Sequence, residues 1–194
     1  MTEKRYRWHV IYDRIKHIEN PVGAEIGVHC GECSAHLLEM HHGLKLYMID
    51  MWSPDTYAGK GDDAATEPYR ELYQDGYFDN RIRALETVEP YKDRAVMYGM
   101  ASIEAAELFP DDFLDFAFID ASHSYEDVKA DILAWLPKIK KSGYIMMHDY
   151  GLFEGVTRAV NEIFGDEIIK FGEPELMIDA IEEIDDDYMA VIKL

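Results

Sequence analysis

The stretch LDFAFID, residues 114–120, constrains the fold more than any other part of the chain. It is a near-continuous apolar run of strand length, as expected for a β-strand that is covered on both faces. Such a strand needs helices on each side of its sheet, and a chain supplies them when strands and helical segments alternate. The run therefore predicts an α/β fold if its neighbours alternate in this way.

The flanking sequence does alternate. Helical periods are expected at residues 6–19, 34–40, 102–109, 126–139 and 155–164. Strands are expected at residues 24–28, 44–50, 94–100, 114–120, 143–149, 167–171 and 188–194. We therefore predict a Rossmann-like, doubly wound, mostly parallel seven-stranded sheet with helices on both faces, formed by one domain over residues 1–194.

Two segments interrupt this alternation. Residues 53–80 are polar and contain several prolines and glycines, which is typical of a lid or a substrate-binding insertion. Residues 181–188, IEEIDDDY, are expected to form a solvated turn. The N-terminal helix, within residues 1–20, could form another wall of the site or mediate a homodimer.

Composition excludes several classes of protein. The 39 acidic residues against 19 basic ones give a net charge of −20, and without a basic stripe this argues against nucleic-acid binding. The apolar runs are far shorter than the roughly 20 residues that span a bilayer, so no membrane segment is expected. With only two cysteines and no apolar leader, a reducing cytoplasm is the expected location.

Both cysteines lie in AEIGVHCGECSAHLLE, residues 24–39, as Cys30 and Cys33. A C-x-x-C pair at a helix start can serve redox chemistry, or zinc if nearby histidines converge on it. The chain has no second C-x-x-C and does not resemble a thioredoxin-like domain. We therefore expect the two cysteines to be small loop residues.

The glycines of the same stretch point to a ligand. In a parallel sheet ligands bind at the carboxyl ends of the strands, and Gly27 would allow a tight turn there while Gly31 lets backbone approach a ligand. The third glycine of the dinucleotide fingerprint is missing. Asp50 ends the next strand, 19 residues after Gly31, where a carboxylate can accept ribose hydroxyls.

At this point the sequence resembles a known family. EIGVHCGECS followed by LYMIDMW is similar to motifs one and two of the class I S-adenosylmethionine-dependent methyltransferases. FIDASHSYEDVKADILAWLPKIKKSGYIMMHDY resembles strands four and five of the subgroup that contains macrocin-type and related small-molecule O-methyltransferases. The resemblance extends over about residues 22–165.

The resemblance implies a set of cofactor-binding residues: Glu25, Gly27, Gly31, Ser34, Asp50, Met51, Trp52, Ala101, Ser102 and Asp120. Asp50 would hold the ribose, with Met51 and Trp52 beside the adenine, although ordinary packing is an equal reading of these two side chains. The family often has Asp-Ser where this chain has Ala101 and Ser102, which weakens that adenine contact.

Asp120 and Asp149 end two strands that should be neighbours, about 4.8 Å apart. Carboxylates at that distance repel each other unless a cation or a proton intervenes. Members of the resembled subgroup place a divalent metal there, and oxygen ligands suit Mg²⁺, with Mn²⁺ or Ca²⁺ as substitutes. His148 is a further candidate ligand, but only if the strand has ended, because neighbouring strand residues face opposite ways.

One position departs from the subgroup. An acid often follows two residues after the first metal aspartate, where this chain has Ser122. His123 is then the best remaining general base, with Asp120 as the other catalytic residue, because imidazole titrates near neutral pH. A histidine bonded to backbone in a loop is the alternative.

The activity that the resemblance implies is methylation of a hydroxyl on a small molecule or sugar by S-adenosylmethionine, with possible help from a divalent metal. The partner would be a small hydroxylated acceptor. Two alternatives stay open: a nicotinamide-dependent oxidoreductase on a similar sheet, and a non-catalytic cofactor-binding domain.

Overall fold

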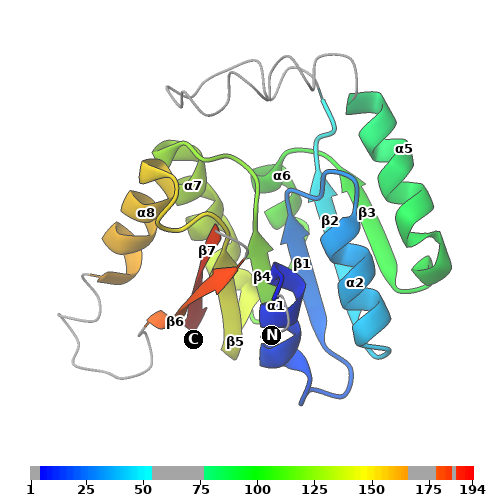
Figure 1. The fold of residues 1–194 in the computed structure, drawn as a ribbon, viewed down its shortest axis with the longest axis horizontal. Helices are drawn as coiled ribbons and strands as arrows, with labels where there is room; N and C mark the ends of the chain where they lie inside the picture. Colours follow the sequence, from blue (N-terminus) through cyan, green and yellow to red (C-terminus); the bar gives the residue numbers. More distant parts are fainter. Residues whose placement is uncertain (1–4, 54–76, 166–177, 185–186) are drawn as a thin grey trace.

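The computed structural model describes residues 5–53, 77–165, 178–184 and 187–194. The strand expected at 167–171 and most of the expected lid, residues 54–76, lie outside these ranges. The described part of the chain forms a layered α/β structure around one sheet (Figure 1).

The sheet has seven strands in the order β3-β2-β1-β4-β5-β7-β6. The strands are β1 Val22–Ile26, β2 Lys45–Asp50, β3 Ala95–Gly99, β4 Leu114–Ile119, β5 Ile139–Met147, β6 Ile178–Ile184 and β7 Asp187–Lys193. The first five are parallel, whereas β7 pairs antiparallel with both β5 and β6. The predicted mostly parallel, seven-stranded Rossmann-like sheet is confirmed. Its strand order reverses at β1, which lies between β2 and β4.

Helices cover both faces, as predicted. The α-helices are α1 Arg7–Ile15, α2 Glu32–Met40, α5 Tyr77–Val88, α6 Ser102–Ala106, α7 Tyr125–Trp135 and α8 Glu154–Val160. One core cluster contains residues of α1, α2 and α5, and the other contains residues of α6, α7 and α8. Figure 1 shows α1 and α2 in front of the sheet.

The central strand β4 explains why two cores can form. All six of its residues are buried. Phe116 and Phe118 belong to the α1 side, whereas Ala117 and Ile119 belong to the α7 side, because successive residues of a strand face opposite ways. Because both faces of β4 are covered, nearly every position of the strand has to be apolar, which explains the apolar run in the sequence.

Two expectations are corrected by the structure. The segment 53–80 does not extend as a loop to its end, because residues 77–80 begin α5, a helix that the polar sequence around it obscured. The described residues of the acidic stretch 181–188 are strand: Ile184 of β6 pairs with Asp187 of β7, and Glu183 pairs with Tyr188. The backbone supplies those hydrogen bonds, and charged residues are common on edge strands such as β6.

Candidate active site

The site lies where β1 and β4 end side by side. Gly27 directly follows β1 and has φ +89°. A Cβ atom on Gly27 would lie 2.0 Å from the carbonyl oxygen of Asp120, the first residue after β4. Only glycine fits this approach and this φ value, so the two strand ends can meet. The ends of β1 and β4 thus form a continuous edge.

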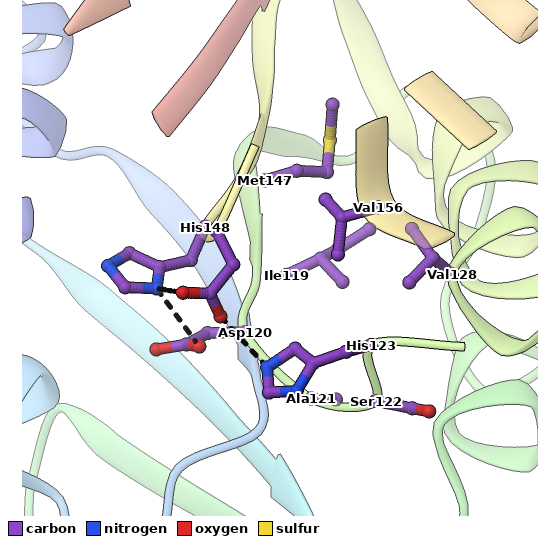
Figure 2. Close-up of a pocket in the computed structure, with 10 residues that line it drawn as sticks. Ile119, Asp120, Ala121, Ser122, His123, Val128, Met147, His148 and Val156 are labelled. Carbon is purple, nitrogen blue, oxygen red and sulfur yellow. Dashed lines mark ion pairs between the residues drawn. The ribbon is translucent and has the colours of Figure 1, made fainter. Parts of the chain in front are cut away.

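Asp120, His148 and Asp149 gather at the ends of β4 and β5. Figure 2 labels Asp120 and His148. β5 ends at Met147, and Asp149 has φ +61°, so His148 and Asp149 are no longer held to opposite faces. His148 Nδ1 lies 3.1 Å from Asp149 Oδ1 and 3.5 Å from Asp120 Oδ1. The three residues predicted as metal ligands are therefore brought together.

His123 joins this group from the loop between β4 and α7. Its Nε2 lies 2.8 Å from Asp149 Oδ2. The ring stacks on Phe153, with centroids 3.9 Å apart and planes 7° from parallel. A Cβ atom on Gly155 would lie 2.2 Å from the carbonyl oxygen of His123, so α8 packs tightly against this loop. The contact with Asp149 was not predicted from the sequence.

The histidines decide the charge of Asp149. Its burial would raise the pKa of the carboxyl, but hydrogen bonds from His123 and His148 outweigh this and hold that pKa well below its ordinary value. Burial lowers the pKa of His148, but the bond to Asp149 and the charge of Asp120 raise it overall. Asp149 is therefore an anion at neutral pH.

Within the described ranges, Asp120, His123 and Asp149 form a group whose possible ligand atoms all lie within 4.8 Å of one another. Two carboxylates and an imidazole suit a divalent cation such as Mg²⁺ or Mn²⁺. A small pocket surrounds the group and is lined by Ile119, Asp120, Ala121, Ser122, His123, Val128, Met147, His148, Asp149 and Val156.

Arg7, the first residue of α1, also reaches this group. One of its guanidinium nitrogens lies 3.1 Å from Asp120 Oδ2. Burial alone would lower the pKa of Arg7, but the neighbouring carboxylates, Asp120 foremost, raise it. Sequence reasoning missed Arg7, because a cation at a helix start belongs to no motif and its partner is 113 residues away.

Glu25 and Ser34 meet on the β1 side of the site. Glu25 is 2% exposed and accepts a hydrogen bond from the Ser34 hydroxyl. Burial raises the pKa of Glu25 to about 8 and outweighs the opposite effect of that bond. Glu25 is therefore mostly protonated at neutral pH, unlike Asp149.

The carboxylate of Asp50 accepts hydrogen bonds from the backbone around it. Its Oδ2 accepts hydrogen bonds from the N–H groups of Val28 and His29, each at 2.9 Å, and its Oδ1 accepts one from Trp52 at 2.8 Å. A carboxylate has about four acceptor positions, so about one remains for a ligand. Asp50 thus ties the turn after β1 to the end of β2.

The two residues after Asp50 differ in exposure. Met51 is 42% exposed, whereas Trp52 is 7% exposed. The indole N–H of Trp52 donates to the carbonyl of His29 at 2.8 Å. Met51 is therefore available to a ligand, and Trp52 is part of the packed core.

Ala101 and Ser102 lie at the start of α6. The Ser102 hydroxyl accepts a hydrogen bond from the indole N–H of Trp135 at 2.9 Å and also bonds to Asp131. The side chain of Ser102 therefore connects α6 to α7, which leaves the backbone of this turn as the part that can face a ligand.

The remaining sequence candidates have local partners. The Ser122 hydroxyl donates to Asp127 Oδ2 at 2.8 Å, at the start of α7. Cys30 lies in the turn before α2, as expected, and its Sγ lies 3.3 Å from Asn80 Oδ1. Cys33 is buried inside α2, so the expectation of a loop residue is wrong for Cys33. Burial raises the pKa of the Cys33 thiol well above its ordinary value, which disfavours a redox role.

Comparison with known proteins assigns the family. A family model described as a methyltransferase domain matches residues 24–150, from β1 to just past Asp149. The match includes more than half of the chain and both strand-end regions described above. The chain belongs to this methyltransferase family. Membership implies S-adenosylmethionine as the methyl donor.

Solved structures share the fold of this methyltransferase. The O-methyltransferase NovP aligns with a TM-score of 0.61 at 18% identity, over 96% of this chain and 76% of NovP. A candidate caffeoyl-CoA O-methyltransferase from Staphylococcus aureus aligns with a TM-score of 0.61 at 17% identity, over 100% of this chain and 86% of that one. At identities this low, the structural alignments show that the fold is shared and do not by themselves show the function.

Among curated proteins, "Uncharacterized protein y4gI" of Sinorhizobium fredii is 25% identical over 103 residues, or 53% of this chain. The methyltransferase chain spans only 10% of that protein's length. None of the helices in the described ranges combines the length and the apolar character that crossing a bilayer requires.

The turn after β1 fits the cofactor that the family implies. Gly27 and Gly31 both have positive φ, and neither carries a side chain that would cover the turn. Gly31 is the N-cap of α2, so the first N–H groups of that helix border the same turn. The donor set at Asp120 and Asp149 likewise fits a hard divalent cation.

Proposed function

We propose that this methyltransferase transfers the methyl group of S-adenosylmethionine to a hydroxyl oxygen of a small-molecule acceptor, with help from a divalent metal. The observation that carries the proposal is the pair of carboxylates, Asp120 and Asp149, at adjacent strand ends beside the glycine turn of β1. The two O-methyltransferases of similar fold support oxygen as the acceptor atom.

On the cofactor side, Gly27 and Gly31 would give access to the backbone, and Asp50 would use its remaining acceptor position for a ribose hydroxyl. Met51 would contact the adenine, with the backbone at Ala101 on its edge. Ser34, Trp52 and Ser102 would act by holding these parts in place, since their polar atoms bond within the protein.

On the metal side, Asp120 and Asp149 would hold the cation, and His148 would keep the two carboxylates in position from its buried place between them. When bound, a divalent cation supplies a Lewis acid that lowers the pKa of the acceptor hydroxyl. Mg²⁺ is the expected ion, with Mn²⁺ or Ca²⁺ able to replace it.

His123 would remove the acceptor proton. Its Nε2 is held by Asp149, which leaves Nδ1 to accept the proton, and the Phe153 stack keeps the ring in place. The acceptor oxygen bonds to the methyl carbon as the carbon–sulfur bond breaks, releasing S-adenosylhomocysteine. The protein contributes alignment of the two reactants.

Calorimetry and a transfer assay test the proposal together. S-Adenosylmethionine and S-adenosylhomocysteine should bind, and NAD should not. Labelled methyl groups should then appear on members of a panel of sugars, vicinal diols and phenols in the presence of Mg²⁺. Binding of NAD would contradict the cofactor, whereas cofactor binding with no transfer to any member would favour a non-catalytic domain.

A further inference from the structure

Five side chains form a continuous row of charged and polar contacts across the candidate metal site. Arg7 faces Asp120 Oδ2, His148 faces Oδ1 of both Asp120 and Asp149, and His123 faces Asp149 Oδ2. Each of the four carboxylate oxygens therefore has a nitrogen no more than 3.5 Å away. Each oxygen keeps about one further acceptor position, so a metal that binds there would lie next to these nitrogen-bearing side chains.

The three nitrogen-bearing side chains respond differently to a metal. A neutral imidazole has a lone pair, so His123 and His148 can stay beside a cation as ligands or as supporting partners. The guanidinium of Arg7 has no acceptor atom and keeps its proton at any ordinary pH. Arg7 must therefore leave Asp120 or remain beside the metal as a like charge.

We infer that Arg7 is an internal counter-ion that competes with the divalent metal for Asp120. Without metal it neutralises Asp120 and holds the carboxylate in place. Its positive charge then lowers the affinity of the site for a cation, because like charges repel each other more strongly in a partly buried site than in bulk water. This inference rests on the metal site of the proposed function.

The local structure allows Arg7 to leave without moving α1. Trp8, the next residue, is 7% exposed and stacks between Tyr6 and His36, with ring centroids 4.5 Å and 4.2 Å away. The start of the helix is thereby anchored to α2. The side chain of Arg7 is 31% exposed, so it can turn toward solvent while the backbone stays in place.

The chain offers a matched control two residues earlier. Arg5 pairs with Asp13 at 2.9 Å, and both side chains are exposed, at 45% and 37%. Arg5→Gln removes the same charge from the same end of the chain as Arg7→Gln. It differs in leaving the contact with Asp120 intact.

The experiment is a titration of the whole, cofactor-free chain with Mn²⁺ alone. Binding is measured by calorimetry and by the loss of the electron paramagnetic resonance signal of free Mn²⁺. Arg7→Gln and Arg7→Met should bind Mn²⁺ about tenfold more tightly than the wild type, because a nearby positive charge is gone. Arg7→Lys, which keeps the charge, and Arg5→Gln should bind as the wild type does. Arg7→Met keeps much of the packing and supplies the same test if Arg7→Gln does not fold.

If Arg7 had a purely structural role, the Arg7 variants would bind Mn²⁺ more weakly than the wild type, because Asp120 would be less well held in place. Unchanged or weaker Mn²⁺ binding in the Arg7 variants, with normal binding in the wild type, would overturn the competition and leave the metal site standing. Mn²⁺ binding to none of the proteins would overturn the competition as well, and methyl transfer in chelator would then overturn the metal of the proposed function too.

Discussion

Glu25 and Asp149 are both buried carboxyls at the same edge of the sheet, yet their protonation is opposite. Burial raises the pKa of Glu25 to about 8, and the hydrogen bond from the Ser34 hydroxyl offsets only part of this rise. The pKa of Asp149 falls in spite of burial, because His123 and His148 bond to it. Partners, more than depth, decide which carboxyl carries charge.

The comparison separates two regions. In the cofactor region, at the ends of β1 and β2, Glu25 and Asp50 have hydroxyl and backbone partners that build the turn. In the metal region, at the ends of β4 and β5, Asp120 and Asp149 have the side chains of Arg7 and His123 as partners. A metal can compete with such side chains for the carboxylates, whereas it could not take the place of the backbone N–H groups that bond to Asp50.

The largest expected effect is on the metal region. Asp149→Asn should lower turnover by about 10⁴-fold or more, since a neutral amide lacks the negative charge that balances the cation and faces His123. Affinity for S-adenosylhomocysteine, measured by calorimetry, should change little. A parallel loss of cofactor affinity would show that the two regions are not separate.

His123→Ala should lower turnover by about 10²–10⁴-fold, the usual range for loss of a general base. Mn²⁺ affinity, measured in the same preparations, tells a base from a ligand. The proposed base leaves that affinity nearly unchanged, whereas a marked loss of Mn²⁺ binding would make His123 a metal ligand instead.

In the cofactor region, Glu25 should make the free energy of unfolding depend on pH. Folded Glu25 keeps its proton up to about pH 8, whereas the unfolded chain loses it near the ordinary glutamate pKa of 4.5, so the free energy of unfolding falls as pH rises between these values. The loss should be about 3 kcal/mol between about pH 5.5 and 7.5.

Glu25→Gln has no proton to lose, so this part of the pH dependence should be absent in the variant. Urea unfolding at several pH values measures the free energy of unfolding of both proteins. Asp149 has the opposite sign: its lowered pKa stabilises the fold above its unfolded pKa and the benefit is lost as pH falls. A Glu25→Gln variant with the same pH profile as the wild type would mean that Glu25 is charged, which would remove the contrast.

The smallest expected effect belongs to Asp50. Asp50→Asn should weaken cofactor binding by about 1.5–3 kcal/mol, through loss of charged acceptors for the turn and for one ribose hydroxyl. Calorimetry measures this, and urea unfolding measures the separate cost to the turn. Full affinity in a folded variant would remove Asp50 from the cofactor region.

The sequence predicted what local patterns encode. Apolar strands such as 114–120, with glycine or an acid at their ends, follow from periodicity, and parallel topology brings those ends to one edge. It could not predict contacts between distant residues: Arg7 with Asp120, or His123 with Asp149. The backbone partners of Asp50 were equally hidden, because a loop conformation, not a motif, aims those N–H groups.

The most direct test that the cofactor region and the metal region are separate is to measure methyl transfer in the presence of chelator and again after Mg²⁺ is added. The affinity for S-adenosylhomocysteine is measured on the same samples. The account predicts that chelator abolishes transfer, that Mg²⁺ restores it, and that affinity for S-adenosylhomocysteine is nearly unchanged throughout. Full transfer in chelator would contradict it, and the carboxylates of β4 and β5 would then need another role.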